Sequence, residues 1–367
     1  MRSTIAEINT LSLRQNFQLL RSFAPNSAIM PMVKANAYGH GIIECSKILS
    51  DEGAEFLGVA FASEGMLLRE AGIPTPIVVM TPPETSELSL FIEYSFHAIA
   101  CSLETVRRIS VEAARQGGVA QLHLYIDTGM SRDGIMPDDA LTFMDEVKNL
   151  SHIEWVGICT HFATSDEKDT TFAEFQLKLF NQVLENLANN GYFFKYIHAS
   201  NTAAIAHLPS ARFDLIRPGL SLHGCGATEE IALQLHLQPT LKLRSSIISL
   251  RRVPAGTPVS YGRKYFTTKE TTIATIPIGY GDGYFRSLTG KAECLIHGKR
   301  YAIVGTICMD ECMVDIGDDM MECGEEVVLI GRQGDEIITA NQVAEKCGTI
   351  PYEVLTAISA RVPRVFI

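Results

Sequence analysis

Residues 31–41 are Pro31-Met32-Val33-Lys34-Ala35-Asn36-Ala37-Tyr38-Gly39-His40-Gly41. They complete an apolar run, residues 28–33, that predicts a buried strand ending at Lys34. A lysine in that position is costly unless it is paired or neutral. Burial lowers the pKa of a lysine, and a neutral amine is a nucleophile that forms a Schiff base with an aldehyde. The alternative is a lysine whose stem packs at the strand end while its ammonium group reaches water.

The composition is that of an ordinary globular protein. The chain has 367 residues, 46% hydrophobic and 20% charged, which is enough for one large domain and one small one. Its net charge of -11 argues against nucleic acid and anionic membranes as partners. No apolar run approaches the roughly 20 residues that span a bilayer.

The cysteines and the first residues favour a cytoplasmic protein. Residues 1–7 lack the long apolar core of a signal peptide. The nine cysteines are scattered without a C-x-x-C pair, and an odd count in a chain without a signal indicates free thiols. Cys308 and Cys312 are close in sequence, but no histidine pair accompanies them at zinc spacing, so we expect buried thiols and no metal site.

Strand-like and helical patterns alternate over the first 220 residues or so. Eight short runs predict strands at residues 28–34, 56–61, 76–81, 97–101, 121–126, 154–160, 195–199 and 213–217. The clearest helix between them covers residues 171–190, where Asn190-Gly191 ends it. This alternation predicts an α/β fold with an N-terminal (β/α)₈ barrel of the TIM type. An open doubly wound sheet is the rival, but no G-x-G-x-x-G opens the first helix.

Beyond a linker predicted at residues 225–238 the pattern changes. Strand-like stretches rich in β-branched residues follow at 240–253, 271–277, 292–297, 300–306, 312–316 and 325–330. Only two short helices interrupt them, one capped by Thr339 and one started by Pro351. We therefore expect a barrel domain over residues 1–230 and a mostly β domain over residues 231–367.

Polar residues follow the predicted strands at the end where such barrels carry their chemistry. They are Lys34 after the first strand, Arg132 after the fifth, His161 after the sixth, Asn201-Thr202 after the seventh and Arg217 after the eighth. Each alone has a plainer interpretation, as a solvated loop charge, a core histidine or a helix cap. Their occurrence on one rim beside a lysine favours a functional site.

This rim suits pyridoxal phosphate, the commonest cofactor that binds lysine as a Schiff base. Asn201-Thr202 opens a helix, and helix N-termini bind phosphate through free N–H groups. Gly219 allows close backbone approach at the usual phosphate position of a barrel. Arg217 could meet the pyridine nitrogen, which would stay largely unprotonated because arginine keeps its proton. The cofactor would then be a weak electron sink.

These residues resemble the motifs of one family, the alanine racemases. The matching segments are residues 33–41, 127–132, 160–163, 198–201, 217–219, 259–262, 278–283, 307–310 and 361–364. The resemblance covers nearly the whole chain, in order and at family-like spacing. It implies a barrel that carries pyridoxal phosphate, a C-terminal β domain, and a head-to-tail homodimer that interconverts L- and D-alanine and supplies D-alanine for peptidoglycan.

The resemblance also implies roles for individual residues. Lys34 would bind the cofactor covalently, His161 would lie against its ring, and Arg217 would face its nitrogen. The phosphate would be held by Tyr38, Thr202, Gly219, Leu220 and Tyr352. Arg132 and the backbone of Met309 would hold the substrate carboxylate, and Tyr280 and Arg286 would line the access corridor.

Inversion at carbon needs two bases, because the planar carbanion must lose a proton on one face and gain one on the other. By the resemblance, Lys34 serves D-alanine, and Tyr261 of the partner subunit serves L-alanine. A free tyrosine has a pKa of about 10, so a phenolate base needs cationic neighbours. The alternative for Tyr261 is an aromatic residue that packs near a domain interface.

The sequence departs from the family at three positions. Tyr125 stands where a lysine, often carbamylated, is common, so Tyr125, Asp133 or a bound anion would have to hold Arg132. Thr306 replaces a usual arginine of the access corridor, and His223 replaces a common tyrosine.

Two other functions remain open at this point. One is a racemase for serine or for a broader set of amino acids. The other belongs to a different class, a non-catalytic pyridoxal-phosphate-binding protein, although such proteins lack the β domain.

Overall fold

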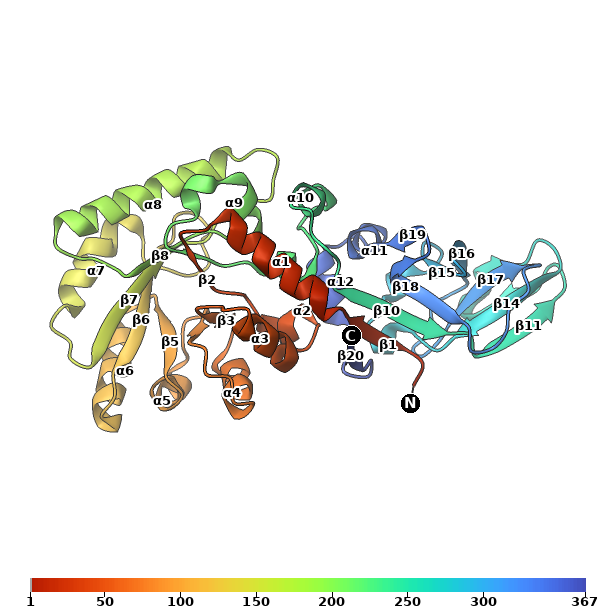
Figure 1. Cartoon of the computed structure of the whole chain (residues 1–367), viewed down its shortest axis with the longest axis horizontal. Coiled ribbons are helices and arrows are strands. Elements are labelled where there is room, and N and C mark those ends of the chain that lie inside the picture. Colours follow the sequence, from red (N-terminus) through yellow and green to blue (C-terminus); the bar gives the residue numbers. More distant parts are fainter. Residues whose placement is uncertain (1) are drawn as a thin grey trace.

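The computed structural model describes residues 2–367 and has two parts joined side by side (Figure 1). One part is a parallel barrel, and the other is a large, mostly antiparallel sheet. None of the helices within the described residues has the length and apolar character needed to cross a membrane.

Eight parallel strands form the barrel, as predicted. They are β2 (Ala28–Ile29), β3 (Leu57–Val59), β4 (Ile77–Val79), β5 (Phe96–Ala100), β6 (Ala120–Tyr125), β7 (Ile153–Cys159), β8 (Tyr196–His198) and β9 (Leu215–Ile216). Strands β3 to β8 are hydrogen-bonded in order, and β2 pairs with β9. The N–H of Met32 and the amide of Arg217 reach the neighbouring Pro218 and Ser200 carbonyls, so backbone bonds continue where the short strands stop.

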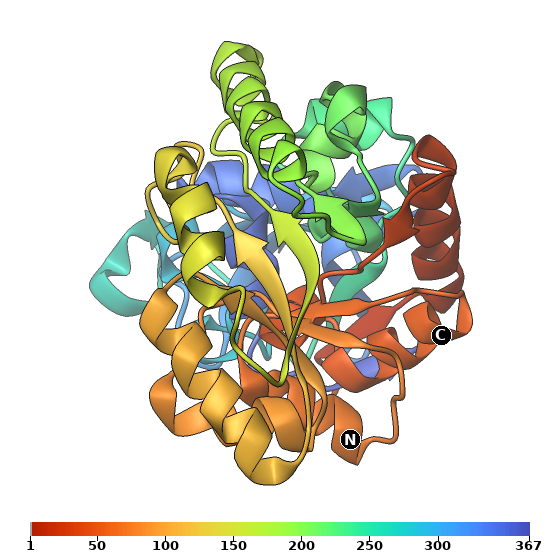
Figure 2. The same cartoon turned by 90° about the vertical axis from the view of Figure 1, so that its left-hand side faces the viewer.

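Helices surround this barrel (Figure 2). They are α1 (Thr10–Phe23), α3 (Ile42–Asp51), α4 (Ala62–Glu70), α5 (Leu88–Glu93), α6 (Leu103–Gln116), α7 (Ala140–Val147), α8 (Thr171–Asn189) and α9 (Thr202–His207). The short element α2 (Lys34–Tyr38) is a left-handed turn at the mouth of the barrel. The apolar faces of these helices bury one continuous core against the strands. A second, smaller core inside the barrel includes Met30, Phe56 and Tyr125.

The other part is built on one ten-stranded sheet. Its strands include β10 (Leu241–Ser246), β11 (Ser249–Val253), β14 (Thr271–Ile276), β15 (Glu293–Ile296), β16 (Lys299–Val304), β17 (Cys312–Gly317), β18 (Glu326–Gln333) and β19 (Glu336–Ile338). A two-stranded hairpin, β12 (Pro258–Val259) and β13 (Tyr265–Phe266), lies apart from it. Helix α11 (Ala340–Cys347) is capped by Thr339 as predicted and is followed by Gly348. Helix α12 (Pro351–Ala357) starts at Pro351 as predicted but ends at Ala357, earlier than the expected end near residue 360.

Three details differ from the sequence-based expectations. The run 240–253 forms two strands, because the chain turns at Ile247-Ile248 and β11 pairs only with β14. The expected linker 225–238 contains a helix, α10 (Glu229–Gln234), whose Ile231 is buried. Strand β1 (Ile5–Ile8) was missed; it lies in the ten-stranded sheet between β10 and β20 (Arg364–Phe366). Pairing between segments so distant in sequence has no local signal.

Candidate active site

A cavity of about 440 Å³ opens at the carboxyl ends of the barrel strands. It brings together ten of the residues that the sequence predicted for the site, namely Lys34, Tyr38, Arg132, His161, Asn201, Thr202, Arg217, Gly219, Leu220 and Tyr352. Segments from almost the whole length of the barrel, and one residue of α12, therefore converge on one space. Such convergence is what the ends of parallel strands produce.

The segment after Lys34 is a left-handed turn. Ala35, Asn36, Ala37 and Tyr38 have φ values of 51°, 57°, 51° and 53°. For residues that carry a Cβ this conformation costs roughly 1–2 kcal/mol each, and left-handed residues normally occur singly. Backbone strain of this kind persists where the surroundings fix it, and such places are frequently functional.

Glu64 on α4 fixes this turn from outside. Its carboxylate accepts the Ala35 N–H at 2.6 Å through one oxygen and the Ala60 N–H at 2.8 Å through the other. The Asn36 side chain adds a bond by accepting the Ile42 N–H at 2.9 Å. Sequence reasoning missed Glu64, because nothing in a helical glutamate marks it as the support of a turn 29 residues earlier.

We expect Glu64→Ala to destabilise this turn. Two backbone N–H groups lose a charged acceptor, which should lower the free energy of unfolding by about 1–3 kcal/mol. Chemical denaturation measures it, with Glu70→Ala as the matched control, because Glu70 lies on the same helix with its side chain exposed. Equal stabilities of the two variants would contradict a supporting role for Glu64.

Lys34 is held partly buried at the cavity wall. Burial is the main cause that lowers its pKa, and the positive charge of Arg132 lowers it further, while Glu64 acts in the opposite direction. The lowered pKa and the place of Lys34 in the cavity wall agree with a functional amine rather than a lysine whose ammonium group reaches open water.

Arg217 is buried, with 3% of its surface exposed, and it has no acidic partner within residues 2–367. Its guanidinium instead donates to neutral groups. Nη1 bonds His198 Nδ1 at 2.8 Å, and Nη2 bonds the Thr160 and Ala199 carbonyls at 2.8 and 3.0 Å and His161 Nδ1 at 3.3 Å. Its positive charge is therefore left uncompensated beside the cavity.

A file of buried histidines extends behind Arg217 across the barrel interior. His123 Nδ1 lies 2.9 Å from His198 Nε2, and its Nε2 lies 3.1 Å from His97 Nδ1. Because arginine can only donate, each histidine must accept at Nδ1 and donate from Nε2–H. Gly157 makes room for the file, since a Cβ there would meet His123 Nδ1 at 2.3 Å.

The sequence pointed to His198 but not to His97 or His123. The available signal was the position of these two histidines within predicted strands. Each lies two or more residues before the end of its strand, where a polar side chain that faces inward needs a hydrogen-bond partner. Burial lowers the pKa of His97 to about 4 and that of His123 well below its ordinary value.

The turn after β9 packs tightly against its neighbours. A Cβ at Gly219 would meet the Tyr38 hydroxyl oxygen at 2.3 Å, so only glycine lets the two segments approach this closely. The Gly219 N–H donates to Thr202 Oγ1 at 3.1 Å. Asn201 caps α9 by accepting the Ala204 N–H at 3.0 Å, which was the plainer interpretation of that residue and is compatible with a place in the cavity wall.

Arg132 and Tyr125 show how the first departure from the family motifs is accommodated. The Arg132 guanidinium lies 3.4 Å from the Asp133 carboxylate. Burial raises the pKa of Tyr125 to about 12, while Arg132 and Arg217 act in the opposite direction. Asp133 thus supplies the negative partner, and Tyr125 is a neutral neighbour in the same cavity.

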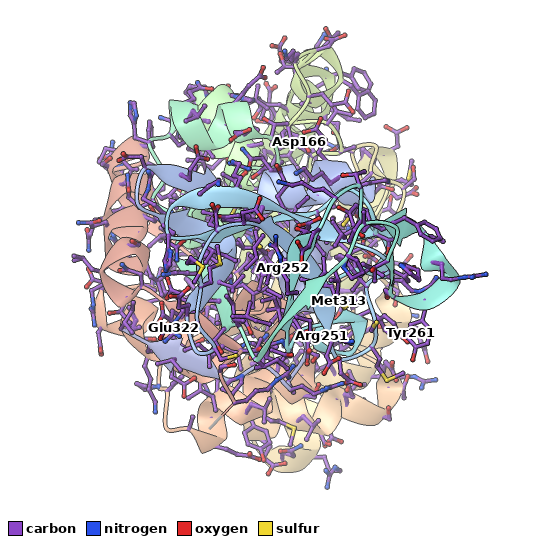
Figure 3. All side chains as sticks on the ribbon, turned by 90° about the vertical axis from the view of Figure 1, so that its right-hand side faces the viewer. Asp166, Arg251, Arg252, Tyr261, Met313 and Glu322 are labelled. Carbon is purple, nitrogen blue, oxygen red and sulfur yellow. The ribbon has the colours of Figure 1, made fainter. Side chains whose placement is uncertain are left out.

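Apart from Tyr352, the predicted residues of the β part do not join this cavity. Tyr261 belongs to a short 3₁₀ turn after β12 and is 73% exposed, at the margin of the molecule (Figure 3). Tyr280 and Met309 are 41% and 52% exposed, and Arg286 is exposed as well. Within one chain, Tyr261 lines a separate open hollow with Ser260 and Cys308.

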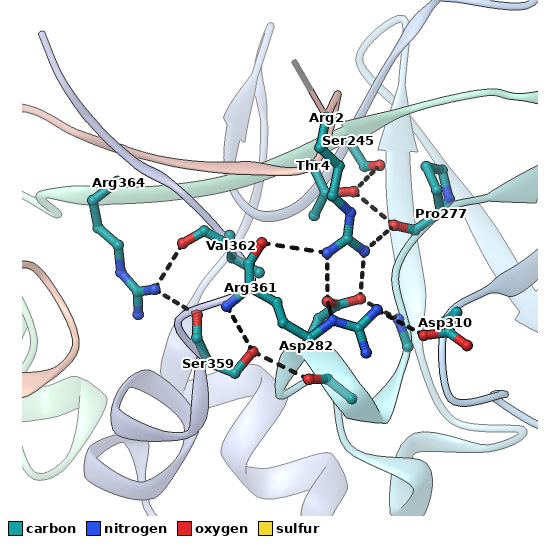
Figure 4. Close-up of polar contacts among 12 residues, drawn as sticks. Arg2, Thr4, Ser245, Pro277, Asp282, Asp310, Ser359, Arg361, Val362 and Arg364 are labelled. Atoms are coloured by element: carbon teal, nitrogen blue, oxygen red, sulfur yellow. Dashed lines mark hydrogen bonds and ion pairs between the residues drawn. The ribbon is translucent and has the colours of Figure 1, made fainter.

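Buried Asp282 ties the loops of Tyr280 and Met309 together (Figure 4). It forms a two-pronged ion pair with Arg2 at 2.5 and 2.6 Å and a further one with Arg361 at 3.2 Å. Arg361 also bonds the Asp310 carboxylate at 2.7 Å. The Met309 loop joins the Tyr280 turn directly, because the Gly281 N–H donates to the Met309 carbonyl at 2.9 Å. Three of the sequence motifs, residues 278–283, 307–310 and 361–364, are therefore joined around Asp282 and Arg361.

Comparisons with known proteins agree with this geometry. Family models described as the N-terminal and C-terminal domains of alanine racemase match residues 8–226 and 240–366. An alanine racemase of Carboxydothermus hydrogenoformans is 43% identical over 371 residues, with all of both chains covered. One of Clostridium novyi is 39% identical and covers all of this chain and 96% of its own.

Solved structures show the same likeness. The alanine racemase of a D-cycloserine-producing Streptomyces lavendulae has a TM-score of 0.95 at 34% identity, covering 100% of this chain and 97% of its own. That of Bacillus anthracis, with bound L-Ala-P, has a TM-score of 0.94 at 35% identity, covering 100% and 95%. The two cavities, the motifs and the full-length matches lead to one conclusion: this chain belongs to the alanine racemase family and is an amino-acid isomerase.

Proposed function

We propose that this racemase inverts alanine with two bases, Lys34 on one face of the α-carbon and Tyr261 of the partner subunit on the other. The observation that supports this proposal is the separation of Lys34 and Tyr261 within a single chain. Lys34 lines the closed barrel cavity, whereas Tyr261 is 73% exposed and lines a different hollow. Two such residues can face one carbon only if a second chain supplies one of them. We therefore propose a homodimer whose sites are shared.

The donor set of the cavity fits pyridoxal 5'-phosphate. Three cations, Lys34, Arg132 and Arg217, line the cavity, and Asp133 is the one carboxylate among its described lining residues. Such an excess of positive charge suits a ligand that carries a phosphate and a substrate carboxylate. When bound, this cofactor supplies an electron sink for the α-carbanion.

We assign the following roles to the residues of the cavity. Lys34 would bind the cofactor covalently, and His161 would pack against its ring. The residues proposed to hold the phosphate are Tyr38, Asn201, Thr202, Gly219, Leu220 and Tyr352. Arg217 would donate to the pyridine nitrogen, and because arginine does not release its proton, that nitrogen would stay unprotonated and side reactions of the carbanion would be limited.

The substrate carboxylate is proposed to bind Arg132 and the backbone of Met309. Tyr280 and Arg286 are proposed to line the access corridor. Since Met309, Tyr280 and Tyr261 all lie outside the barrel cavity, we propose that the partner subunit brings them. Asp282 and its arginine partners hold the Met309 and Tyr280 loops together as one unit.

Each turnover removes one proton from the α-carbon and returns one to it, so the overall reaction neither consumes nor releases a proton. From L-alanine, the Tyr261 oxygen takes the α-proton while the Lys34 ammonium gives one to the opposite face. Tyr261 ends protonated and Lys34 neutral, and a net proton must pass back before the next L-alanine. In the opposite direction Lys34 is the base and Tyr261 the acid.

We also propose a place for the enzyme in the cell. All nine cysteines are free thiols, as a reducing compartment requires, which supports a cytoplasmic location. There it would supply D-alanine for peptidoglycan. A preference for serine or a broader substrate set has no support from the relatives, all named for alanine.

The test has two parts, one that identifies the substrate and one that shows whether two subunits share a site. Purified protein is incubated with L-alanine, L-serine or L-lysine, and chiral chromatography should show conversion of alanine foremost. Lys34→Ala and Tyr261→Phe subunits, each expected to be strongly impaired alone, are then co-expressed. A shared site should restore about a quarter of wild-type activity, because half the dimers are mixed and each has one intact site. Absence of restored activity in isolated mixed dimers would reject the shared site.

A further inference from the structure

Thr306 lies directly behind the turn that carries Tyr261. It stands where the family usually has a corridor arginine, yet it is only 2% exposed, so it adds nothing to the corridor surface. Its hydroxyl donates to the Tyr261 carbonyl at 2.7 Å. In return, the Ser260 hydroxyl donates to the Thr306 carbonyl at 2.5 Å.

The turn that these bonds hold is strained. Ser260 and Arg263 have φ values of 65° and 48°, in the left-handed region that side chains disfavour, and Gly262 lies there too at 72°. Ser260 and Arg263 each cost of the order of 1 kcal/mol or more and need surrounding contacts to persist, whereas Gly262 adopts this conformation freely. The contacts within the turn itself are weak, since the Arg263 N–H reaches the Ser260 carbonyl only at 3.3 Å.

The strand behind the turn is shaped for this contact. Gly305 has a φ of 71°, and a Cβ there would meet Ser260 Cβ and the Val259 carbonyl at 2.8 Å. Glycine therefore lets the end of β16 approach the turn closely enough for both hydrogen bonds. Cys308 Sγ lies 3.5 Å from Ser260 Oγ and the Thr306 carbonyl, and so closes the group.

The Tyr261 phenol makes no hydrogen bond within residues 2–367, so this chain fixes only its backbone. We infer that Thr306 is a positioning residue for the base Tyr261: its hydroxyl holds the Tyr261 carbonyl and so aims the phenol that the proposed dimer presents to the partner's site. The inference rests on the proposed function, because it takes Tyr261 as the base for L-alanine.

The test compares Thr306→Val, which removes only the hydroxyl, with Thr306→Ser, which keeps it. The matched control is Thr267→Val, because Thr267 is 3% exposed, lies in the same hairpin and donates to the Pro254 carbonyl at 2.7 Å. Hydrogen–deuterium exchange of the peptide 258–266 reports the turn directly, without substrate. It should speed up in Thr306→Val and stay near wild type in the other two variants.

The second readout separates the two bases. In D₂O, loss of the α-proton from L-alanine depends on Tyr261, and loss from D-alanine depends on Lys34. Thr306→Val should slow the exchange of the α-proton of L-alanine about tenfold, because sub-ångström misplacement of a reacting group lowers the reaction rate steeply. The exchange of D-alanine should stay near the wild-type rate. We expect kcat to fall with little change in KM, and Thr306→Ser to restore it.

Two results would overturn the inference. One is a Thr306→Val enzyme that matches Thr267→Val in both readouts, and the other is an equal loss of exchange from both enantiomers with no change in the 258–266 peptide. Tyr261→Phe distinguishes failure of the inference from failure of the proposed base. If that variant still exchanges L-alanine at the wild-type rate, the assignment of the base is wrong, whereas the amide exchange of the turn still tests the Thr306 contact.

Discussion

Tyr261→Phe should lower kcat/KM for alanine racemisation by about 10²–10⁴-fold, the usual contribution of a positioned general acid or base. The substitution removes one oxygen. Since the side chain is 73% exposed and its phenol makes no hydrogen bond within residues 2–367, the free energy of unfolding should not change. The loss can then be assigned to chemistry and not to folding.

The direction of exchange makes this prediction specific. Overall racemisation must fall equally in both directions, because the equilibrium constant between enantiomers is fixed. Isotope exchange in D₂O has no such constraint. Loss of the α-proton from L-alanine should nearly stop in Tyr261→Phe, whereas D-alanine should still exchange through Lys34.

Tyr265→Phe is the matched control for this variant. It removes the same oxygen four residues away, where the phenol donates to the Asp315 carboxylate at 2.6 Å. It should cost about 1 kcal/mol of stability and leave kcat/KM near wild type. If Tyr261→Phe kept the control's activity, the second base would have to be sought among other residues that reach the Lys34 cavity.

The barrel could be predicted from the sequence because its signals are local. Strands such as β4 and β6 are short apolar runs between helices with clear periodicity, and their carboxyl ends fix where polar residues gather. Lys34, His161 and Arg217 could therefore be placed on one rim before any coordinates were known.

The turn at residues 35–38 could not be predicted, because Ala, Asn, Ala and Tyr carry no signal for four successive left-handed residues. Its stability depends on Glu64, a contact made in space. The same limit applies to β1, whose partners β10 and β20 lie more than 230 residues away in sequence. Thr306 was marked as a departure, but only the structure places its hydroxyl on the Tyr261 carbonyl.

The second large effect that we expect is a steep loss of stability in mild acid. Six histidines have lowered pKa values in the fold. Five of them are buried, namely His40, His97, His123, His198 and His223, and the sixth, His161, is half-buried at the cavity. Burial is the first cause in each case. It lowers the pKa of His40 and His97 to about 4 and that of His161 to about 3, and it holds the pKa of the other three well below the ordinary value.

The sign follows from which state binds protons. Above pH 6.5 these histidines are neutral in both states, and they cost the fold nothing. As the pH falls from 6.5 towards 4, the unfolded chain takes up protons that the folded chain refuses, so stability falls. Each histidine contributes at most about 1.4 kcal/mol per pH unit, and six together approach about 8 kcal/mol per unit, against a total stability of about 5–15 kcal/mol.

Denaturant unfolding at pH values from 8 to 5.5 measures this slope, and the proton uptake on unfolding gives it independently. Carboxylates with lowered pKa values lose their stabilisation only below about pH 4.5, so they do not obscure this window. His223→Tyr should reduce the uptake by about one proton, because the ring of His223 stacks on His40 at 3.9 Å and stays neutral there. A stability that stays constant from pH 7 to 5.5 would mean that these histidines take up protons in the folded state as they do in the unfolded chain. The row of hydrogen bonds from Arg217 to His97, in which each histidine accepts at Nδ1 and donates from Nε2–H, does not permit such protonation.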